Sequence, residues 1–415
     1  MKHKLLLLIL ALSSNITLAG MPPHLDPEMT GKEYRSIFTS LEQNPQFRQR
    51  IAADPLVEIL ALGKRNLDWI EVINNSRDAA HKLQLTTPEN EPAYPIDAPG
   101  NSNRDMIMAR LAALKNSMPA EMATVLFGTG PLSEAVPVDD KIFITNAFTL
   151  NRIYEAASRW LLEEPYLDWY KQNAQMDIRG YYFLNKQTDL NQHLQHWSTL
   201  DEATQNKYAE WLLSECNNTV GNMDICQTGL TKAIKNRQVL AYHQQYVAAA
   251  AQMYNELFEL QNPRPEVVWN NKHPDVMAMP FSLPDRQDVQ EWFKTNVEDE
   301  YHLNDWSLQI NYSKLGNLAR IVFTPGTTPH VNGLGGDTIY MDANRALQEY
   351  EVTWTIRHEF GHVLGFPDCY VEFYDTKHDV MVNYQVDITN LMCSRRGHLQ
   401  PKHYEQLKKY YYQGK

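Results

Sequence analysis

The sequence predicts a multidomain protein in which a mostly α-helical N-terminal region precedes an α+β domain. Between residues 20 and 260, apolar side chains recur every three or four positions, as they do along one face of a helix. Residues 261–284 contain five prolines and predict a linker between two folded parts. From residue 285 onward, short segments of strand type alternate with helical ones. A chain of 415 residues is long enough for two or three domains.

The N-terminal region is expected to contain several separate helices. It has no fixed-period repeat and no low-complexity tract, and residues that break helices interrupt its periodic pattern. The predicted helical segments are residues 34–60, 105–114, 152–170, 200–213 and 230–260, and the predicted breaks are residues 88–103 and 118–140.

The C-terminal domain, residues 285–415, is expected to combine a small mixed sheet with helices. Amphipathic periodicity predicts a first helix, a central helix and a last helix, at residues 285–300, 349–363 and 402–411. Alternating apolar residues or short β-branched runs predict three strands between the first two helices, at residues 307–311, 320–323 and 338–341.

The first 19 residues have the features of a secretory signal peptide. Lys2 and Lys4 flank the start of an apolar run from Leu5 to Leu12, and small residues precede a cleavage position after Ala19. The run is too short to span a membrane, no cysteine follows it that could carry a lipid, and no second run reaches spanning length. We therefore expect an exported protein, secreted or periplasmic, without a membrane anchor.

The chain is acidic. Its formal net charge is −12, and loss of the two signal-peptide lysines changes this to −14. An acidic surface disfavours nucleic acid and anionic membranes as partners. The charge does not select a substrate.

The sequence H-E-F-G-H-V-L-G-F-P-D carries the strongest chemical signal in the chain. Its His358 and His362 are four residues apart, so on a helix their imidazoles lie on one face, where two neutral rings can hold one Zn²⁺. Glu359 beside them is a candidate general base. Gly365 can end the helix in a left-handed turn without a Cβ penalty. That turn would bring Asp368 back toward the metal as a third ligand.

This sequence resembles the active-site motif of the metzincin zinc peptidases, H-E-x-x-H-x-x-G-x-x-H followed by a Met-turn. The third ligand is Asp368 in place of histidine, as in the snapalysin branch of that clan, and the F-G and L-G pairs are similar to the matrixin form of the helix. The Met-turn candidate is Met392 within N-L-M-C-S, and the predicted last helix follows it. The resemblance covers about the final 150 residues.

The resemblance implies a secreted zinc-dependent endopeptidase that hydrolyses peptide bonds in protein or peptide substrates. One catalytic Zn²⁺ held by His358, His362 and Asp368 would activate a water molecule. Glu359 would take a proton from that water and return it to the leaving amine. Met392 would lie beneath the metal as an apolar floor and not as a ligand.

Two further expectations follow from the resemblance. In the family, an edge strand near residues 329–336 holds the substrate by backbone pairing, although a flexible glycine loop is the alternative here. Some relatives place a tyrosine ligand two residues after the Met-turn methionine. Ser394 occupies that position in this chain, so stabilisation of the oxyanion by that tyrosine is not expected.

The four cysteines allow three disulfide connectivities in an oxidising compartment. We expect the two local pairs, Cys216 with Cys226 and Cys369 with Cys393. The members of the second pair directly follow the proposed third ligand and the proposed Met-turn methionine, so that bridge would fasten the metal loop to the floor of the site. Free buried thiols are the alternative.

Two other metal assignments stay open. Glu372 is the nearest candidate for a third ligand of the gluzincin type, in which a glutamate on a later helix binds zinc, although its surroundings lack a helical pattern. Asp375, Asp379 and Asp387 could bind Ca²⁺. Their spacing matches no EF-hand loop, so a solvated acidic loop is the default.

The roles of residues 20–260 and of the whole chain also have alternatives. The helical region is either a propeptide that blocks the cleft of a zymogen or a permanent domain, and its length of about 240 residues favours the domain. The rival function is an exported binding protein or adhesin with a structural or inactive zinc site. A closed structural site needs four protein ligands, and the sequence nominates three. Neither substrate specificity nor oligomeric state is predicted.

Overall fold

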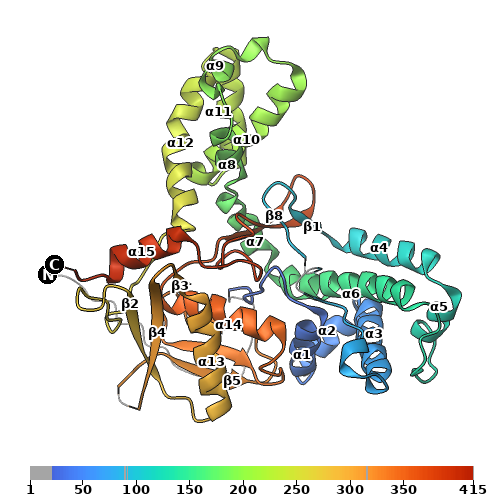
Figure 1. Ribbon diagram of the computed structural model, residues 1–415. Helices are drawn as coiled ribbons and strands as arrows, with labels where there is room; N and C mark the ends of the chain where they lie inside the picture. The colour runs from blue at the N-terminus through green and yellow to red at the C-terminus, as the bar shows by residue number, and fades with distance from the viewer. Residues whose placement is uncertain (1–20, 88–89, 91, 315, 415) are drawn as a thin grey trace.

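The computed structural model describes residues 21–87, 90, 92–314 and 316–414, so the predicted signal peptide and its cleavage position lie outside the described residues. The chain is mixed α and β, with helices predominating before residue 260 and small sheets after it. Its buried apolar side chains form three cores, two in the helical region and one in the C-terminal domain (Figure 1). No helix in the described ranges combines the length and the hydropathy of a membrane span.

The first helical part is organised around α6 (Asp140–Glu163), which packs against α1, α3 and α4. The single helix expected at residues 34–60 is three helices in the structure. Pro45 starts a new helix, and Pro55 disfavours helical geometry in the residue before it. The other elements are α1 (Gly31–Leu41), α2 (Pro45–Ala52), α3 (Val57–Asn75), α4 (Arg104–Ser117), α5 (Ala120–Leu126), α7 (Leu167–Asn173) and the 3-10 turns Ala79–His81, Glu164–Tyr166 and Ala174–Met176.

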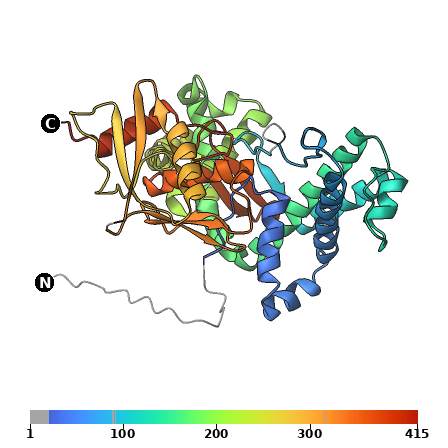
Figure 2. The same ribbon diagram turned by 60° about the horizontal axis from the view of Figure 1, so that its bottom comes forward.

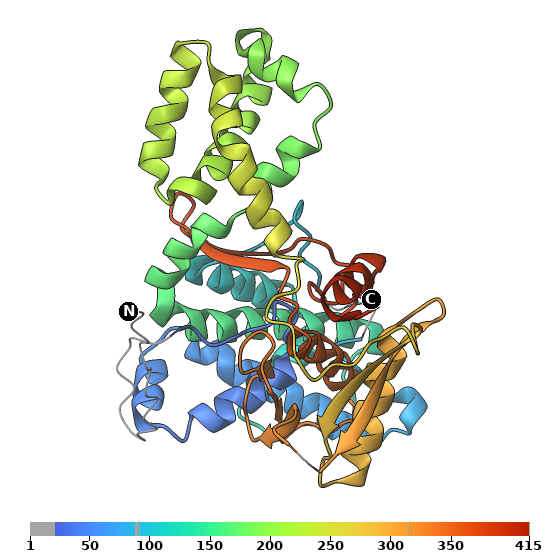
Figure 3. The same cartoon turned by 90° about the vertical axis from the view of Figure 1, so that its left-hand side faces the viewer.

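The second helical part has a core of its own and projects from the rest of the molecule (Figures 1 and 3). The predicted disulfide between Cys216 and Cys226 is present and joins two neighbouring helices of this bundle. The residues expected to form one helical domain therefore pack around two centres. The helices are α8 (Arg179–Asn185), α9 (Leu190–Gln195), α10 (Glu202–Val220), α11 (Met223–Lys235) and α12 (Val239–Glu256), with a 3-10 turn at Trp197–Thr199.

The C-terminal domain contains two three-stranded sheets that meet at one bridge, between Phe281 and Ala319. Across them the strand order is β3-β4-β2-β5-β7-β6, with β2 parallel to β4, β5 parallel to β7, and β6 antiparallel at the edge. Helix α13 (Gln287–Glu300) connects β2 to β3 and packs on α14 (Tyr350–Val363). The strands are β2 (Val276–Ser282), β3 (His302–Leu303), β4 (Trp306–Ser313), β5 (Arg320–Thr324), β6 (His330–Val331) and β7 (Thr338–Asp342), and the last helix is α15 (Pro401–Tyr411).

Strand β2 corrects the predicted linker, because residues 276–282 were expected to lie outside the sheet. Pro280 argues against a strand, since proline lacks the N–H that a ladder needs. In β2 the N–H groups of Ala278 and Ser282 donate to Val268 and Ala319, each at 2.8 Å. Alternate residues donate to the same side of a strand, so the missing N–H of Pro280 falls between these two partners. The proline therefore leaves the ladder intact.

A third sheet joins the two halves of the chain. Hairpin strands β8 (Tyr370–Asp375) and β9 (Val380–Gln385) follow the metal motif, and β1 (Gly100–Ser102) of the helical region pairs antiparallel with β9. Tyr374 and Met381 of the hairpin are buried in the core of the first helical part. The helical region therefore pairs with and packs against the β8–β9 hairpin, which lies between the third candidate ligand and the Met-turn. Figure 2 shows the C-terminal strands on the left and helices α1–α6 on the right.

Candidate metal centre

Helix α14 carries both predicted histidine ligands on one face. His358 and His362 lie four residues apart, and both side chains are buried. Their rings meet edge to face, with centroids 4.7 Å apart. The helix itself packs on α13, β6 and β7, which fixes the position of this face relative to the sheet.

The chain reverses direction directly after α14, as the sequence predicts. Gly365 has a φ of +95°, and its N–H donates to the carbonyl of His362 at 3.0 Å. The N–H of Phe366 donates to the carbonyl of Gly361, also at 3.0 Å. A Cβ at Gly365 would lie 1.9 Å from the carbonyl oxygen of Gln261, so the turn also requires glycine for space. The reversal returns the following residues to the face that carries the histidines.

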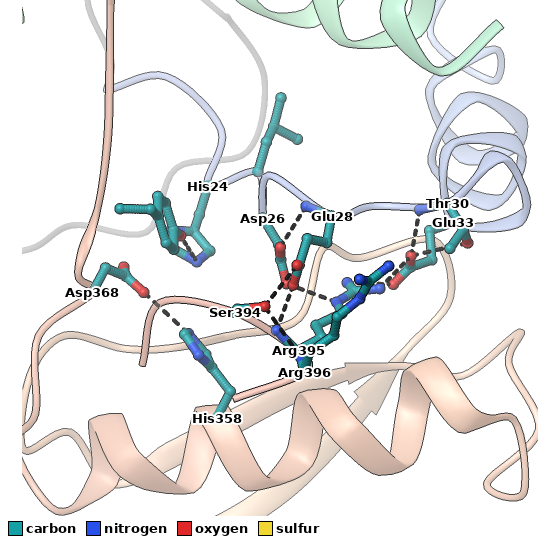
Figure 4. A network of polar contacts seen from close by, with 12 residues as sticks. His24, Asp26, Glu28, Thr30, Glu33, His358, Asp368, Ser394, Arg395 and Arg396 are labelled. Carbon is teal, nitrogen blue, oxygen red and sulfur yellow. Dashed lines mark hydrogen bonds and ion pairs between the residues drawn. The ribbon is translucent and has the colours of Figure 1, made fainter. Parts of the chain in front are cut away.

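Three donor atoms converge beyond this turn. Asp368 Oδ1 lies 3.0 Å from His358 Nε2 and 3.2 Å from His362 Nε2, and the two Nε2 atoms are 3.0 Å apart. Ligand atoms bound tetrahedrally to one zinc ion, at about 2.0–2.1 Å each, lie about 3.3 Å from one another. The three donors therefore have nearly the separations that a single zinc ion requires. Figure 4 shows the Asp368 carboxylate facing the His358 ring.

The other ring nitrogens fix the tautomers of both histidines. His358 Nδ1 lies 3.0 Å from the carbonyl oxygen of Leu391, and His362 Nδ1 lies 2.7 Å from that of Phe366. A carbonyl accepts only, so each Nδ1 carries the hydrogen and donates it. In the neutral form of each ring, Nε2 then presents a lone pair to the centre of the cluster, as a metal ligand must.

The two histidines and Asp368 each stabilise the charged form of the other. Burial would lower the pKa of His358, but the Asp368 carboxylate outweighs it and raises the pKa to about 9. The pKa of His362 rises for the same reason. Burial would raise the pKa of Asp368, but the two histidines hold it well below its usual range. A proton therefore competes with a metal ion for these three groups, and metal binding should weaken as the pH falls.

Glu359 has the surroundings of a general base. The residue is 2% exposed, and its Oε2 atom makes no hydrogen bond within the described part of the chain. A buried carboxylate oxygen without a partner is costly. Its persistence beside the donors fits a centre that also binds a metal ion and a water molecule. The two imidazoles and the carboxylate are donors of the kinds that zinc takes, so these described residues could hold such an ion.

Met392, the candidate Met-turn residue, packs against α14 at Gly361. It is buried, and a Cβ added at Gly361 would lie 2.3 Å from its sulfur, so the glycine of the motif makes room for the methionine. The predicted disulfide between Cys369 and Cys393 is present and ties the segment after the third donor to the residue after Met392. The N–H of Cys369 also donates to the carbonyl of Met392, at 3.0 Å.

A buried neutral histidine is hydrogen-bonded to the Met-turn. The N–H of Gln400 donates to His403 Nδ1 at 2.8 Å, so the His403 Nε2–H donates to Asn390 Oδ1 at 2.9 Å. The same Asn390 oxygen accepts the N–H of Met392 at 2.8 Å. Burial and the neighbouring Lys402 ammonium lower the pKa of His403 to about 3.

The other acidic candidates are engaged elsewhere. Glu372 lies in β8, not on a helix, and forms an ion pair with Arg159 of α6. The three candidate calcium ligands bind separate partners and form no metal-type group among the described residues. Their partners are His378 and two backbone N–H groups for Asp375, Tyr374 for Asp379, and Thr389, Gln400 and Lys402 for Asp387.

The structure brings further residues to the centre that the sequence analysis missed. His24 lies beside His362 and Asp368, and its Nε2 is 3.2 Å from the hydroxyl of Tyr370. Ser394, at the position of the tyrosine in some relatives, donates to Glu28 at 2.7 Å. No spacing signal connects residues 24–28 with a motif more than 300 positions away, so only the fold could reveal these contacts.

Comparisons with known proteins give no match to this chain, whether with protein-family models, with curated sequences or with solved structures. The interpretation of the centre therefore depends on its own residues.

Gly365→Ala is expected to loosen the end of α14. An L-residue in the left-handed region costs about 1–3 kcal/mol, and the added methyl group would also meet the Gln261 carbonyl. Hydrogen exchange of the α14 amides in the metal-free protein, followed against urea concentration, measures this loss. The control is Gly130→Ala, because nothing lies within 4 Å of a Cβ at that position. Equal protection in the two variants would contradict the account of the turn.

His403 is expected to make the protein sensitive to acid. Its pKa is about 3 in the folded chain against 6.5 for an ordinary histidine, so the unfolded state takes up the proton first. The stabilisation is complete above pH 6.5 and is lost as the pH falls toward 3, by about 2 kcal/mol at pH 5. In His403→Gln the loss in unfolding free energy between pH 7 and pH 5 should be smaller by this amount in denaturant titrations.

The control for this titration is His302→Gln, since the side chain of His302 is exposed. Its acid dependence should equal that of the unsubstituted protein. An unchanged acid dependence in His403→Gln would show that His403 is not held neutral.

Proposed function

We propose that this chain is an exported zinc-dependent endopeptidase of the metzincin type, with His358, His362 and Asp368 as the ligands of one catalytic zinc ion. The observation that carries the proposal is the convergence of three donor atoms within 3.0 to 3.2 Å beside a buried carboxylate oxygen that has no partner in the described chain. A structural ion pair cluster would not need that second carboxylate.

The order of elements supports the same family. A helix between parallel strands, an antiparallel edge strand, the motif helix, a methionine turn and a closing helix follow one another from β2 to α15. This is the order that the metzincin catalytic domain has. Edge strand β6 pairs with β7 only along one side among the described strands, which suits the binding of an extended peptide along its free side.

The residues around the donors suit peptide hydrolysis. Zinc supplies a Lewis acid that polarises the scissile carbonyl and lowers the pKa of a bound water. Glu359 accepts the proton of the attacking water on its unpartnered oxygen and carries it to the nitrogen of the leaving amine. The Nδ1–H bonds of both histidines hold their rings in place through these proton transfers. Ser394 is bound to Glu28 and takes no part in them.

The contacts of the helical region favour a permanent domain over a removable propeptide. Arg159 of α6 pairs with Glu372 of β8, and Asn173 donates to the backbone carbonyl of the same glutamate. The Tyr384 hydroxyl of β9 donates to Asp177 at 3.0 Å. Removing residues 31–256 would strip partners from the hairpin that lies next to the third ligand. We infer that this region shapes the cleft in the active protein.

Export agrees with the cysteine chemistry. Both cysteine pairs are bonded, and the described residues contain no free cysteine. Structural disulfides persist in oxidising compartments, which supports the proposal that the chain is secreted or periplasmic.

In a protein of residues 20–415, Glu359→Gln is expected to slow casein cleavage about a hundredfold or more, because it removes the group that carries the proton. The zinc content should stay near one ion per chain, since the glutamate is not a ligand. Fragments identified by mass spectrometry measure the cleavage, and elemental analysis measures the zinc.

The matched control is Glu405→Gln, which removes one carboxylate from an exposed position of α15 and should leave both readouts unchanged. Equal cleavage by the Glu359→Gln variant would show that Glu359 is not the base. Absence of stoichiometric zinc from the unsubstituted protein would overturn the proposed function.

A further inference from the structure

Residues 21–30, here called the N-terminal segment, pass over the metal centre before α1 begins. Figure 4 shows His24 of this segment beside Asp368, on the side of the carboxylate away from α14. His24, His362 and Asp368 offer ligand atoms that lie within 4.8 Å of one another. The ring centroids of His24 and His362 are 6.4 Å apart, with an interplanar angle of 82°. The segment therefore presents a third imidazole to the cluster.

His24 needs only a small movement to bind a metal ion held by the other donors. Two ligands of one tetrahedral zinc ion lie about 3.3 Å apart, so the His24 donor must approach by at most about 1.5 Å. His24 Nε2 now accepts from or donates to the Tyr370 hydroxyl at 3.2 Å, and Tyr370 is two residues from Asp368. The His24 side chain is half-buried and can rotate about its side-chain bonds between this hydroxyl and the metal.

The backbone of the segment is held from the catalytic side by Arg395. Its Nε donates to Asp26 Oδ2 at 2.8 Å, and its two terminal nitrogens bind Glu33 at 2.9 Å each. Glu28 accepts the Ser394 hydroxyl and the N–H of Arg395. These partners directly follow the Met-turn, so they place the segment relative to the floor of the site.

The helical region holds the same segment from the other side. Leu25 and Met29 are buried in the core of the first helical part. Arg159 donates to the carbonyls of Leu25 and Asp26, at 3.1 and 2.9 Å. His24 directly precedes Leu25, the first buried residue of the segment, and all of these anchoring contacts lie after it.

We propose that His24 is the fourth protein ligand of the metal and that the N-terminal segment closes the centre in the resting protein. This inference rests on the proposed function. Three protein ligands leave a position open for water, and a fourth protein ligand closes it. A ligand on a tethered segment acts at high effective concentration, so it can exclude water from most molecules without binding tightly by itself. Departure of His24 would open the centre.

The test uses residues 20–415 with Co²⁺ in place of zinc and titrates acetohydroxamate against the visible absorption of the metal. The chelator needs open coordination positions, so its apparent affinity falls with the closed fraction of the protein. His24→Ala should bind it about tenfold more tightly or better. The control, His302→Ala, removes an exposed histidine and should bind it as the unsubstituted protein does.

X-ray absorption of the zinc protein gives a second readout that does not depend on folding of a variant. The unsubstituted protein should show three imidazoles on zinc, and His24→Ala should show two. Casein cleavage should rise in the same variant by the factor seen in the chelator titration.

The outcomes separate the inference from the proposed function. Two imidazoles in the unsubstituted protein, with equal chelator affinity in the His24→Ala variant, would overturn the role of His24 and leave the peptidase proposal standing. Three imidazoles with no cleavage by any variant would support His24 as a ligand and overturn the peptidase in favour of a structural zinc site. No bound metal at all would overturn both.

Discussion

The candidate metal centre depends on one reversal of the chain at the end of α14. The two histidines come from a single helix face, and the next residue on that face would lie about 5 Å further along the axis, too far to join both imidazoles at one ion. Gly365 adopts a left-handed conformation, and the N–H groups of Gly365 and Phe366 donate back to His362 and Gly361. The chain therefore reverses direction at the end of the helix. Asp368 then reaches both Nε2 atoms with one oxygen. Every other feature of the centre supports this geometry from outside.

The support comes from neutral partners, which leaves the charge of the centre to its carboxylates. Backbone carbonyls orient both histidines, and the buried thioether of Met392 packs against Gly361 of the same helix. Below the methionine, His403 stays neutral and holds Asn390. A cationic histidine there would repel the metal through a medium of low dielectric constant. Met392, Asn390 and the neutral His403 therefore hold the site in position without adding charge, as the disulfide between Cys369 and Cys393 also does.

Sequence reasoning succeeded where the chemistry is local and failed where distant segments meet. The two histidines, the glycine and the aspartate lie within eleven positions, so helix periodicity and turn geometry were enough to predict that they converge. Both disulfides join cysteines close in sequence and were predicted correctly. Strand β2 was missed because proline lacks the N–H that a strand normally donates. Only the structure shows that no acceptor in the described chain faces Pro280, which lies between the acceptors of Ala278 and Ser282. The contacts of His24, Asp26 and Glu28 were invisible, since their partners follow more than 300 residues later.

The N-terminal segment is anchored both by ion pairs and by apolar burial. Asp26, Glu28 and Glu33 share Arg395 in a buried setting, and burial together with the Asp26 charge raises the pKa of Glu28. Crowded carboxylates repel one another and cost desolvation free energy, which offsets part of their bonds to the guanidinium. The segment also shares the apolar core of the helices that follow it, because Leu25 and Met29 are buried there, whereas His24 comes before these residues and is half-buried. The proposed opening of the centre therefore needs only His24 to move, while the buried part of the segment and the domain behind it keep their places.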